Sequence, residues 1–408
     1  MRQFNQNCQE FCVHKTIHER ADPWYLEDMN TCEKLSVQSA SLLQSLSLVN
    51  FRNYSQRSFA FSSPLVALYG DNGIGKTNIL EAISLFSQGR GLRSSKLSEM
   101  RQVGQEQPWV AAAIFGMNGI AIPFGTALDF GPSGSERRLI KINHIPVKSQ
   151  AILSEWLNVV WVIPSMARLF QEGGSLRRKF VDRMVMALNP SHSERLNRYE
   201  HYLRERSQLL RQGMMDPQWL SSIEQKLSED GVAITIARAN LVRQLTASQS
   251  EDTTSPFPRY FAQMVGEVDD WCRDGVAVDV EDKIRGALAQ SRVQDAQSGG
   301  ASIGPHRSDL AVTHLAKHMP GEMCSTGEQK MLLHAMTLAF IRLLDSYRDR
   351  LTLLLLDDVV AHLDADHRAY LFKEVADILD KGANLQIFMT GTGIHEFNQI
   401  SGIQAIEV

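Results

Sequence analysis

The spacing of apolar residues divides the chain into a short irregular start and a long patterned remainder. Residues 1–44 show neither the period of 2 that marks strands nor the period of 3.6 that marks helices, and their charges are scattered. The first strand-like stretch is Leu46–Val49. We therefore expect residues 1–44 to be a disordered N-terminal extension, either specific to a lineage or translated from too early a start codon, whose removal spares the core.

The next apolar stretches predict a strand, a turn and a helix, followed by an antiparallel sheet. Leu65–Tyr69 has the composition of a buried strand and runs directly into Gly70. Asn78–Phe86 then has the spacing of an amphipathic helix. Short apolar runs separated by glycine, proline and asparagine predict antiparallel strands. These runs are Val110–Phe115, Ile120–Phe124 and Leu139–Ile142.

The middle of the chain is predicted to be helical, and its end alternates between helix and strand. A buried strand at Val159–Ile163 ends at a proline, and helices are expected over residues 193–211 and 217–245. Sustained heptads are absent, so no long coiled coil is predicted. Gln290–Ile303 is polar and rich in glycine and serine, which predicts a loop. The last elements are helices at Glu328–Leu344 and Ala365–Leu379 and strands at Leu351–Leu356 and Leu385–Thr390.

Composition predicts a soluble, cytoplasmic protein without membrane contact. Of the 408 residues 43% are hydrophobic, yet no apolar run reaches the roughly 18–20 residues of a membrane helix. The N-terminus lacks the pattern of a signal peptide. The five cysteines are odd in number and scattered, which disfavours a disulfide framework. Zinc binding is also disfavoured, because the possible ligands have irregular spacing: Cys8, Cys12, His14, His18 and Cys32.

A local basic stretch differs from the net charge of −4 of the whole chain. Between residues 168 and 211, ten basic and five acidic side chains give a net charge of +5. Such a stretch is equally compatible with the solvated face of a helix and with contacts to the phosphates of DNA. The second interpretation would place DNA near Arg177–Lys179.

The turn between the first buried strand and the following helix matches the complete phosphate-loop pattern, GxxxxGK[ST]. Its residues are Gly70, Asp71, Asn72, Gly73, Ile74, Gly75, Lys76 and Thr77. The glycines let backbone N–H groups turn towards a phosphate at the positive start of a helix. Lys76 is predicted to neutralise the β- and γ-phosphates as a catalytic residue, and the Thr77 hydroxyl to bind Mg²⁺. ATP and Mg²⁺ are therefore the expected cofactors.

Two carboxylates follow the leucine-rich strand near the end of the chain. Asp357 stands at the carboxyl end of that strand, where open α/β sheets bind their ligands. It is predicted to hold Mg²⁺ through water, while Asp358 is the candidate general base that polarises the attacking water. The alternative is an ordinary strand that ends in an acidic turn, and the phosphate loop makes this alternative the weaker one.

A third candidate site lies at the start of the helix near residue 328. Ser325 and Glu328 have the spacing of a capping box, which would make this segment a well-capped helix and nothing more. Alternatively, the N–H groups around Ser325 and Gly327 form an anion site for a phosphate, with Gln329 close to the nucleotide.

In combination these motifs resemble the ABC-type ATPase heads of the SMC class. They share the phosphate loop, a Ser-x-Gly-x-Gln helix start far downstream, and Leu-Leu-Asp-Asp followed by Leu363-Asp364. The resemblance is closer to the RecF family of bacterial recombination-repair proteins, and it covers roughly residues 45–400. The segments that carry it are Leu48–Tyr54, Gly70–Ile83, Gly89–Arg93, Gly173–Asp182, Gly304–Asp309, the signature at 325–329 and the acidic pair at 357–358.

The resemblance implies an α/β fold, an ABC-type P-loop ATPase head with a mixed sheet and an inserted helical lobe. Residues 45–164 and 300–408 would form the ATPase lobe, and residues 165–299 the insertion. In such heads two subunits enclose two ATP molecules, and the signature helix of one covers the γ-phosphate bound to the other. Arg52 and Asn53 would lie near the nucleotide. Thr390 departs from the pattern, because it stands where many ABC ATPases carry a switch histidine.

The resemblance also implies a function, namely a weak, DNA-stimulated ATPase that forms a homodimer with ATP. Such a protein would bind single-stranded or gapped DNA in replication and recombinational repair. It would act with the proteins RecO and RecR to help load the recombinase and support the SOS response. Two alternatives stay open. A P-loop nucleotide-dependent kinase or other non-repair ATPase would not need the Ser-x-Gly-x-Gln helix, and a nucleotide-gated scaffold would differ only in its turnover.

Overall fold

Buried strands from distant parts of the chain meet in one parallel sheet. The computed structural model describes residues 41–131, 134–213, 216–250, 252, 254–345, 350–358, 363–382, 384–398 and 400–408. Most of the predicted N-terminal extension lies outside the described residues, as do the disfavoured zinc ligands Cys8, Cys12, His14, His18 and Cys32.

The parallel sheet has the strand order β14-β3-β13-β12-β8. Its strands are β3 (Leu65–Tyr69), β8 (Leu157–Val162), β12 (Leu351–Leu356), β13 (Leu385–Gly391) and β14 (Gln404–Glu407). The first four are buried along nearly their whole length, as expected for a sheet covered on both faces. Because all five strands run in the same direction, their carboxyl ends lie at one edge of the sheet. The predicted strands of this sheet are confirmed to within two residues.

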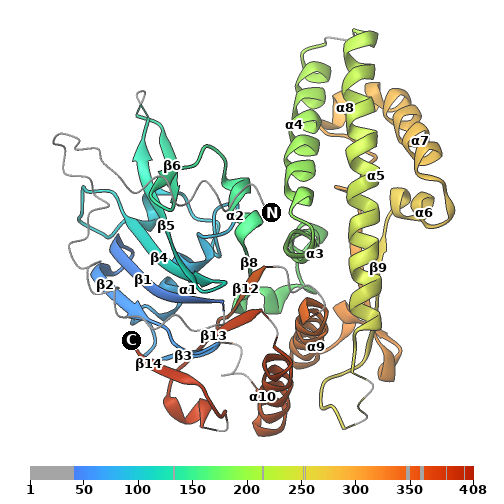
Figure 1. Ribbon diagram of the computed structural model, residues 1–408. Coiled ribbons are helices and arrows are strands. Elements are labelled where there is room, and N and C mark those ends of the chain that lie inside the picture. The colour runs from blue at the N-terminus through green and yellow to red at the C-terminus, as the bar shows by residue number, and fades with distance from the viewer. Residues whose placement is uncertain are drawn as a thin grey trace. The chain divides into compact units, whose positions relative to one another are not determined.

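An antiparallel sheet with the order β2-β1-β4-β5-β6-β7 confirms the second predicted layer. Its strands are β1 (Leu42–Phe51), β2 (Tyr54–Ala60), β4 (Val110–Met117), β5 (Ile120–Phe130), β6 (Glu136–Ile142) and β7 (Ile145–Pro146). Helix α1 (Lys76–Ser84) lies between the two sheets (Figure 1). The ring of Phe86, just after this helix, lies 5.6 Å from the ring of Phe115 in β4, so the layers share one apolar core.

Strand β1 corrects the expected start of the folded chain. It begins at Leu42 and not at Leu46, because Leu42 and Leu43 are both buried. The backbone N–H of Leu43 donates a 2.7 Å hydrogen bond to the buried side chain of Gln386 in β13. The successive leucines hide the alternation that marks a strand in sequence. The predicted boundary at residue 44 therefore falls inside a strand, and removal of residues 1–44 would cut into the core.

The helices beyond α1 lie mainly in the middle of the chain. They are α2 (Leu153–Trp156), α3 (Gly174–Leu188), α4 (Ser191–Arg211), α5 (Pro217–Ala247), α6 (Glu267–Asp274), α7 (Ala277–Gln290), α8 (Arg292–Ser298), α9 (Thr326–Asp345) and α10 (Ala365–Asp380). Helices α9 and α10 pack against each other beside β12 and β13 (Figure 1). No described helix combines the length and the apolar character that crossing a membrane requires.

Two segments differ from the sequence-based expectation. Helix α8 occupies part of the predicted loop Gln290–Ile303, because Asp295 in this polar segment is buried in an ion pair. A small sheet with the order β11-β10-β9 was not predicted. Its strands are β9 (Tyr260–Val265), β10 (Asp309–His314) and β11 (Met319–Pro320). Since β9 and β10 pair across the proposed boundary at 299/300, this boundary does not separate two sets of contacts.

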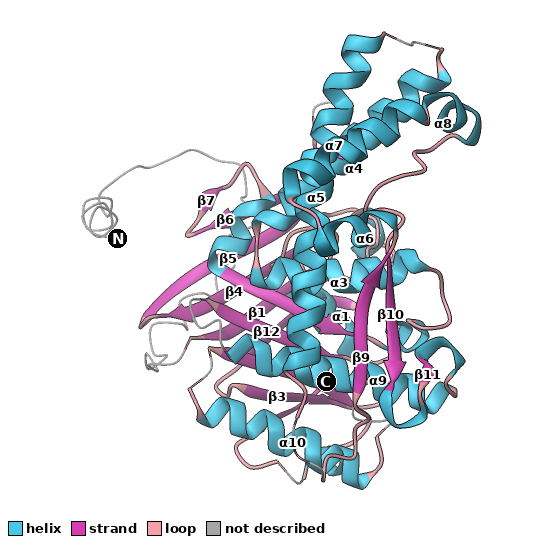
Figure 2. Cartoon of the chain, turned by 90° about the vertical axis from the view of Figure 1, so that its right-hand side faces the viewer, coloured by secondary structure: helices cyan, strands magenta, loops and turns pink. Residues whose placement is uncertain are grey.

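Helices α4 and α5 lie side by side and extend away from the sheets, with α7 and α8 beside them (Figures 1 and 2). A helix of 31 residues such as α5 is about 46 Å long. A second apolar cluster lies here, within residues 199–301. Phe180 of α3 and Leu241 near the end of α5 belong instead to the main core. The proposed insertion 165–299 thus contributes residues of α3 and α5 to the main core.

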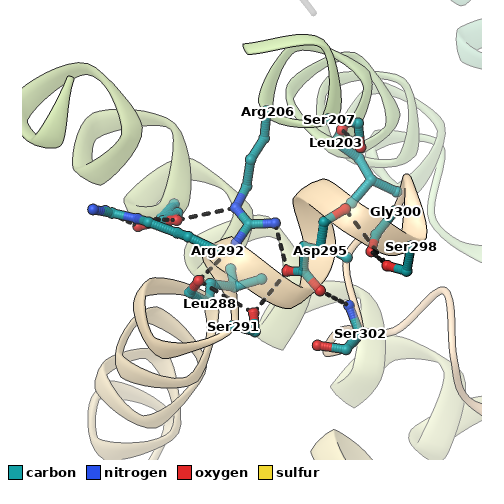
Figure 3. A network of polar contacts seen from close by, with 12 residues as sticks. Leu203, Arg206, Ser207, Leu288, Ser291, Arg292, Asp295, Ser298, Gly300 and Ser302 are labelled. Carbon is teal, nitrogen blue, oxygen red and sulfur yellow. Dashed lines mark hydrogen bonds and ion pairs between the residues drawn. The ribbon is translucent and has the colours of Figure 1, made fainter. Parts of the chain in front are cut away.

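A buried network of ion pairs crosses the second cluster (Figure 3). Arg206 of α4 is 1% exposed and contacts Glu224 of α5 at 3.0 Å and Asp295 of α8 at 2.8 Å. Its guanidinium also donates to the backbone oxygen of Leu288 at 2.6 Å, and Arg292 makes a second ion pair with Glu224. Three helices and the end of α7 therefore meet at one arginine. A buried charge is stable only if it keeps its partners.

Removal of Arg206 tests whether this network holds the helical region together. In Arg206→Ala, Glu224 keeps only Arg292, and the carboxylate of Asp295 loses its cation. We expect the free energy of unfolding to fall by about 3–5 kcal/mol, as for other broken buried pairs. Urea denaturation followed by circular dichroism measures the loss.

Arg204→Ala is the matched control on the same helix. Its partner Glu200 lies 3.7 Å away and both side chains are exposed, so the expected loss is at most about 1 kcal/mol. Equal losses in the two variants would show that the buried network contributes no special stability.

Candidate nucleotide site

The predicted nucleotide-binding residues gather at the carboxyl edge of the parallel sheet. The loop after β3 leads into α1, and Asp357 and Asp358 follow β12. Strand β13 lies between β3 and β12 and ends at the same edge. The two halves of the site, far apart in the sequence, are therefore brought together by strand order alone.

Gly75 is the most tightly constrained residue of the phosphate loop. Its φ of 126° is a conformation that side chains rarely adopt. A Cβ atom here would lie 2.5 Å from the Tyr54 hydroxyl and 2.6 Å from Nδ2 of Asn53. Asn53 Nδ2 also donates to the backbone oxygen of Ile74 at 2.6 Å. The turn between β1 and β2 thus holds the phosphate loop from outside.

Lys76 is positioned to meet a phosphate. Its side chain is 6% exposed, and its ammonium donates to the backbone oxygens of Gly70 at 2.6 Å and Asp71 at 2.9 Å. Both acceptors belong to the loop itself, so the charge is held inside the curve of the loop without a carboxylate partner among the described residues. This arrangement fits a nucleotide whose β- and γ-phosphates would give the ammonium its counter-charge.

Thr77 and Asp357, the two predicted Mg²⁺ ligands, are in direct contact. The Thr77 hydroxyl donates to Oδ1 of Asp357 at 2.9 Å. Asp357 is 4% exposed, and burial together with the nearby Asp358 carboxylate raises its pKa, although the bonds from Thr77 and Thr390 oppose the shift. A hydroxyl beside a buried carboxylate is a donor set that suits Mg²⁺. The residues present therefore fit the expected metal.

A single hydroxyl positions both carboxylates. Thr390, at the end of β13, donates to Oδ1 of Asp357 at 3.0 Å and accepts the backbone N–H of Asp358 at 2.8 Å. Asp358 has a φ of 49°, a left-handed conformation that costs about 1–2 kcal/mol and needs support from its surroundings. Thr390 thus orients the candidate base through the backbone.

Arg52 and Asn53 take different positions relative to the loop. Asn53 contacts the loop directly, as described above. The guanidinium of Arg52 is bound to both oxygens of Glu81, at 2.8 and 2.5 Å, and to the backbone oxygen of Glu99. Arg93 also pairs with Glu81 at 3.0 Å. Arg52 therefore braces helix α1, and its predicted contact with the nucleotide stays a proposal.

Three residues around the loop were not among the predicted ones, namely Tyr54, Glu81 and Arg93. Glu81 is fully buried within the apolar pattern of α1. A carboxylate at such a position needs a cation, and this need is the one signal in the sequence that could have led to Arg52 and Arg93.

The start of α9 combines both interpretations of the signature segment. The backbone N–H of Ser325 donates to Oε2 of Glu328 at 2.8 Å and the N–H of Glu328 to the Ser325 hydroxyl at 3.4 Å, which confirms the capping box. Lys317 pairs with Glu328, and together with these bonds it lowers the pKa of Glu328 to about 2. Ser325 and Gly327 remain exposed. Within the described chain, no hydrogen bond joins them to residues 70–77.

Gln329 has a structural role that the sequence did not suggest. It is 2% exposed and its side-chain amide donates to the backbone oxygens of Cys324 at 3.0 Å and Glu322 at 3.2 Å. With these bonds it fixes the turn that precedes the helix, and its predicted place at the nucleotide stays a prediction.

Only part of the basic stretch is turned inward, and five of its ten basic side chains are exposed. Arg177 is buried and binds both oxygens of Asp309, and Arg178 donates to the backbone oxygen of Ser308 at 2.7 Å. The guanidinium of Arg183 lies 3.9 Å above the ring of Trp161, and burial lowers its pKa to about 10. Paired or buried arginines are not available to DNA phosphates, so Arg177 and Arg178 are poor candidates for the predicted contact. Lys179 is exposed.

With this geometry established, the curated relatives decide the family. DNA replication and repair protein RecF of Mesorhizobium japonicum is 40% identical over 362 residues, which is 88% of this chain and 94% of that protein. The proteins of the same name from Rhizobium etli and Brucella abortus are 42% and 39% identical over 86% and 88% of this chain, and over 92% of their own lengths. The chain belongs to the RecF family. A family model described as an AAA domain also matches residues 45–110.

RecF structures show the same fold. Two solved structures of the recombination mediator protein RecF of the RecFOR pathway, RecF-ATPrS and RecF-ATP, align with TM-scores of 0.75 and 0.74. Their sequences are 22% and 23% identical to this chain. The alignments cover 91% and 90% of this chain and 97% of each RecF chain. The fold is therefore that of an α/β ABC-type ATPase head, as predicted. RecF membership also argues against the P-loop kinase.

Two glycine substitutions separate a steric from a conformational effect in the loop. We expect Gly75→Ala to weaken ATP binding by at least about 100-fold, because its Cβ would overlap Tyr54 and Asn53 and displace the loop. Gly73 has a φ of 84°, and a Cβ atom added there would have no other atom within 4 Å. Only backbone strain therefore opposes Gly73→Ala. A loss of about 10-fold, worth about 1–2 kcal/mol, is expected there.

Titration with a fluorescent ATP analogue compares the two variants with the unchanged protein. If Gly75→Ala bound ATP as well as Gly73→Ala, the close approach of the β1–β2 turn would not be needed for the loop.

Proposed function

We propose that this chain is a weak, DNA-stimulated ATPase of replication and recombinational repair that binds single-stranded or gapped DNA. The observation that carries the proposal is the Thr77–Asp357 contact at 2.9 Å, which completes a nucleotide site in a member of the RecF family. The relatives are named as DNA replication and repair proteins, which supports the biological role.

Each residue of the site has its own role in the proposed hydrolysis. Lys76 and the loop N–H groups hold the β- and γ-phosphates, and Asp358 orients a water for in-line attack on the γ-phosphorus. As the new P–O bond forms, the bond to the β-phosphate oxygen breaks, and ATP and water give ADP, orthophosphate and a proton. Mg²⁺, held by Thr77 and by Asp357 through water, would neutralise charge on the phosphate oxygens.

The exposed start of α9 supports a second part of the proposal, an ATP-dependent homodimer. Ser325 and Gly327 are open to solvent and make no hydrogen bond to residues 70–77 of their own chain. The backbone N–H of Gly327 at this helix start suits an anion brought by another molecule, and the Ser325 N–H would reach that anion by exchanging its bond to Glu328. In the proposed dimer they bind the γ-phosphate held by the second subunit, so ATP joins the subunits and ADP does not.

The remaining roles are proposed from the family alone. They are binding to RecO and RecR, help in loading the recombinase, support of the SOS response, and a cytoplasmic location. The RecFOR pathway of the solved RecF structures is consistent with the first two.

Hydrolysis with and without DNA tests the main proposal. We expect slow ATP turnover that rises several-fold with gapped DNA. Lys76→Ala should weaken ATP binding by about 10- to 100-fold, because at least one charge-assisted contact of about 1.5–3 kcal/mol is lost. Release of phosphate from labelled ATP measures the turnover, and titration with a fluorescent ATP analogue measures the affinity.

Lys96→Ala, which removes an exposed lysine after the same helix, is the control and should match the unchanged protein. ATP binding without any turnover would point to the nucleotide-gated scaffold. If gapped DNA did not change the rate of ATP turnover, the proposed stimulation by DNA would be contradicted.

Sedimentation tests the dimer. We expect a monomer without nucleotide or with ADP, and a dimer when Lys76 holds a slowly hydrolysed ATP analogue. Ser325→Arg should abolish the dimer by steric and charge conflict at the helix start, yet bind the analogue with unchanged affinity.

Ser222→Arg introduces the same side chain at an exposed position of α5 and should still dimerise. The sandwich arrangement is refuted by a mass that does not respond to nucleotide, or by a Ser325→Arg dimer.

A further inference from the structure

A pocket of 360 Å³ opens beside the two carboxylates, on a side that the phosphate loop does not reach. Its walls come from the end of β8, from the short 3-10 segment η4 (Pro164–Arg168), from the first half of α9 and from Asp357 and Asp358. None of residues 70–77 lines it. Its volume lies in the range of small-molecule sites, which hold about 300–1,000 Å³.

The charged groups of this pocket carry both signs. Asp357 and Asp358 form one part of its lining, and the cations Arg168 and Lys330 belong to other elements, η4 and α9. Among the described residues, neither cation has a hydrogen-bonding or ion-pair partner for its side chain. Their nitrogens therefore stay more than 4.0 Å from the carboxylate oxygens, although all four groups line the same hollow.

Two unpaired cations in one pocket attract an anion. The imidazole of His334, which is 9% exposed, and the hydroxyl of Thr326 add polar lining beside Lys330 on α9. An anion between Arg168 and Lys330 would gain charge-assisted hydrogen bonds that the protein itself does not supply. The carboxylates of the same lining repel the anion, so its favourable position is the one closest to the two cations.

We propose that this pocket binds the orthophosphate produced by hydrolysis, before it leaves the protein. This inference rests on the proposed function. When the bond between the γ-phosphorus and the ADP oxygen breaks, orthophosphate and ADP are two anions in one site, and both lie near Asp357 and Asp358. Repulsion from ADP and the carboxylates drives orthophosphate away, and attraction to Arg168 and Lys330 gives the movement a direction.

The proposal assigns separate tasks to two lysines. Lys76 holds the phosphates of the substrate, within the loop. Lys330 lies on α9, the helix whose start would bind the γ-phosphate of the second subunit, and holds the product. Occupancy of the pocket would thus place the released anion against the same helix that joins the subunits.

Direct titration with inorganic phosphate tests the site without the need for turnover. The full chain is first saturated with Mg²⁺ and ADP, which fills the loop, and phosphate is then added at constant ionic strength. Its ³¹P NMR signal reports binding. We expect saturable binding, with a Kd raised at least about 10-fold in Lys330→Gln and in Arg168→Gln, since each loses one charge-assisted contact.

Lys179→Gln is the matched control, because Lys179 is an exposed lysine on α3 outside the pocket, and its Kd should not change. Circular dichroism and ADP affinity show whether each variant is folded. If Lys330→Gln does not fold, Arg168→Gln, which changes an exposed side chain, still tests the site.

Two results would overturn the proposal. One is the absence of saturable phosphate binding in the ADP-bound protein. The other is binding that ignores Lys330 and Arg168 but is lost in Lys76→Ala, which would place the phosphate in the substrate position. A protein that binds phosphate in this pocket yet hydrolyses no ATP contradicts the proposed function alone.

Discussion

The hydrogen bond between the Thr77 hydroxyl and the Asp357 carboxylate is the contact on which the site depends. It joins residues that are 280 positions apart, and it exists because β3, β13 and β12 are neighbours in one parallel sheet. Thr390 on the middle strand then fixes both carboxylates. The segment between Thr77 and Asp357 contains the second sheet and the long helices. Its structure preserves the site as long as β3, β13 and β12 remain neighbours in this order.

The arginines of the middle segment show a second constraint, which is the burial of charge. Arg206, Arg238 and Arg177 each bind carboxylates from elements far away in sequence, and the first two are almost fully buried. Replacing such pairs by apolar residues is often neutral for stability, whereas removing one partner is costly. These pairs therefore fix which helix lies against which, and they explain why a stretch with a net charge of +5 presents only part of that charge to solvent.

Local patterns were sufficient where a single segment determines its own structure. The phosphate loop, the leucine-rich strand β12 and the helix α9 were predictable because glycine spacing, apolar runs and a capping box act over a few residues. Partners distant in sequence were not predictable. Strand β9 is short and half exposed, and among the described strands it pairs only with β10, whose residues Asp309 and Leu310 lie 44 and 46 positions after their partners Val265 and Met264. Likewise Gln329 reads as a signature residue, and only the fold shows that its amide caps the preceding turn.

The order of the strands also has a consequence for synthesis on the ribosome. The phosphate loop emerges early, but its sheet partners β12, β13 and β14 are the last strands of the chain. At roughly 5–20 residues per second, the 280 positions that separate Thr77 from Asp357 correspond to about 15–55 s of translation. During that time β3 has no neighbouring strand and the nascent loop has no carboxylate partner. A chain interrupted before β12 would therefore carry an intact phosphate-loop sequence and still lack the acidic half of its site, so nucleotide binding of full strength is a property of the finished chain.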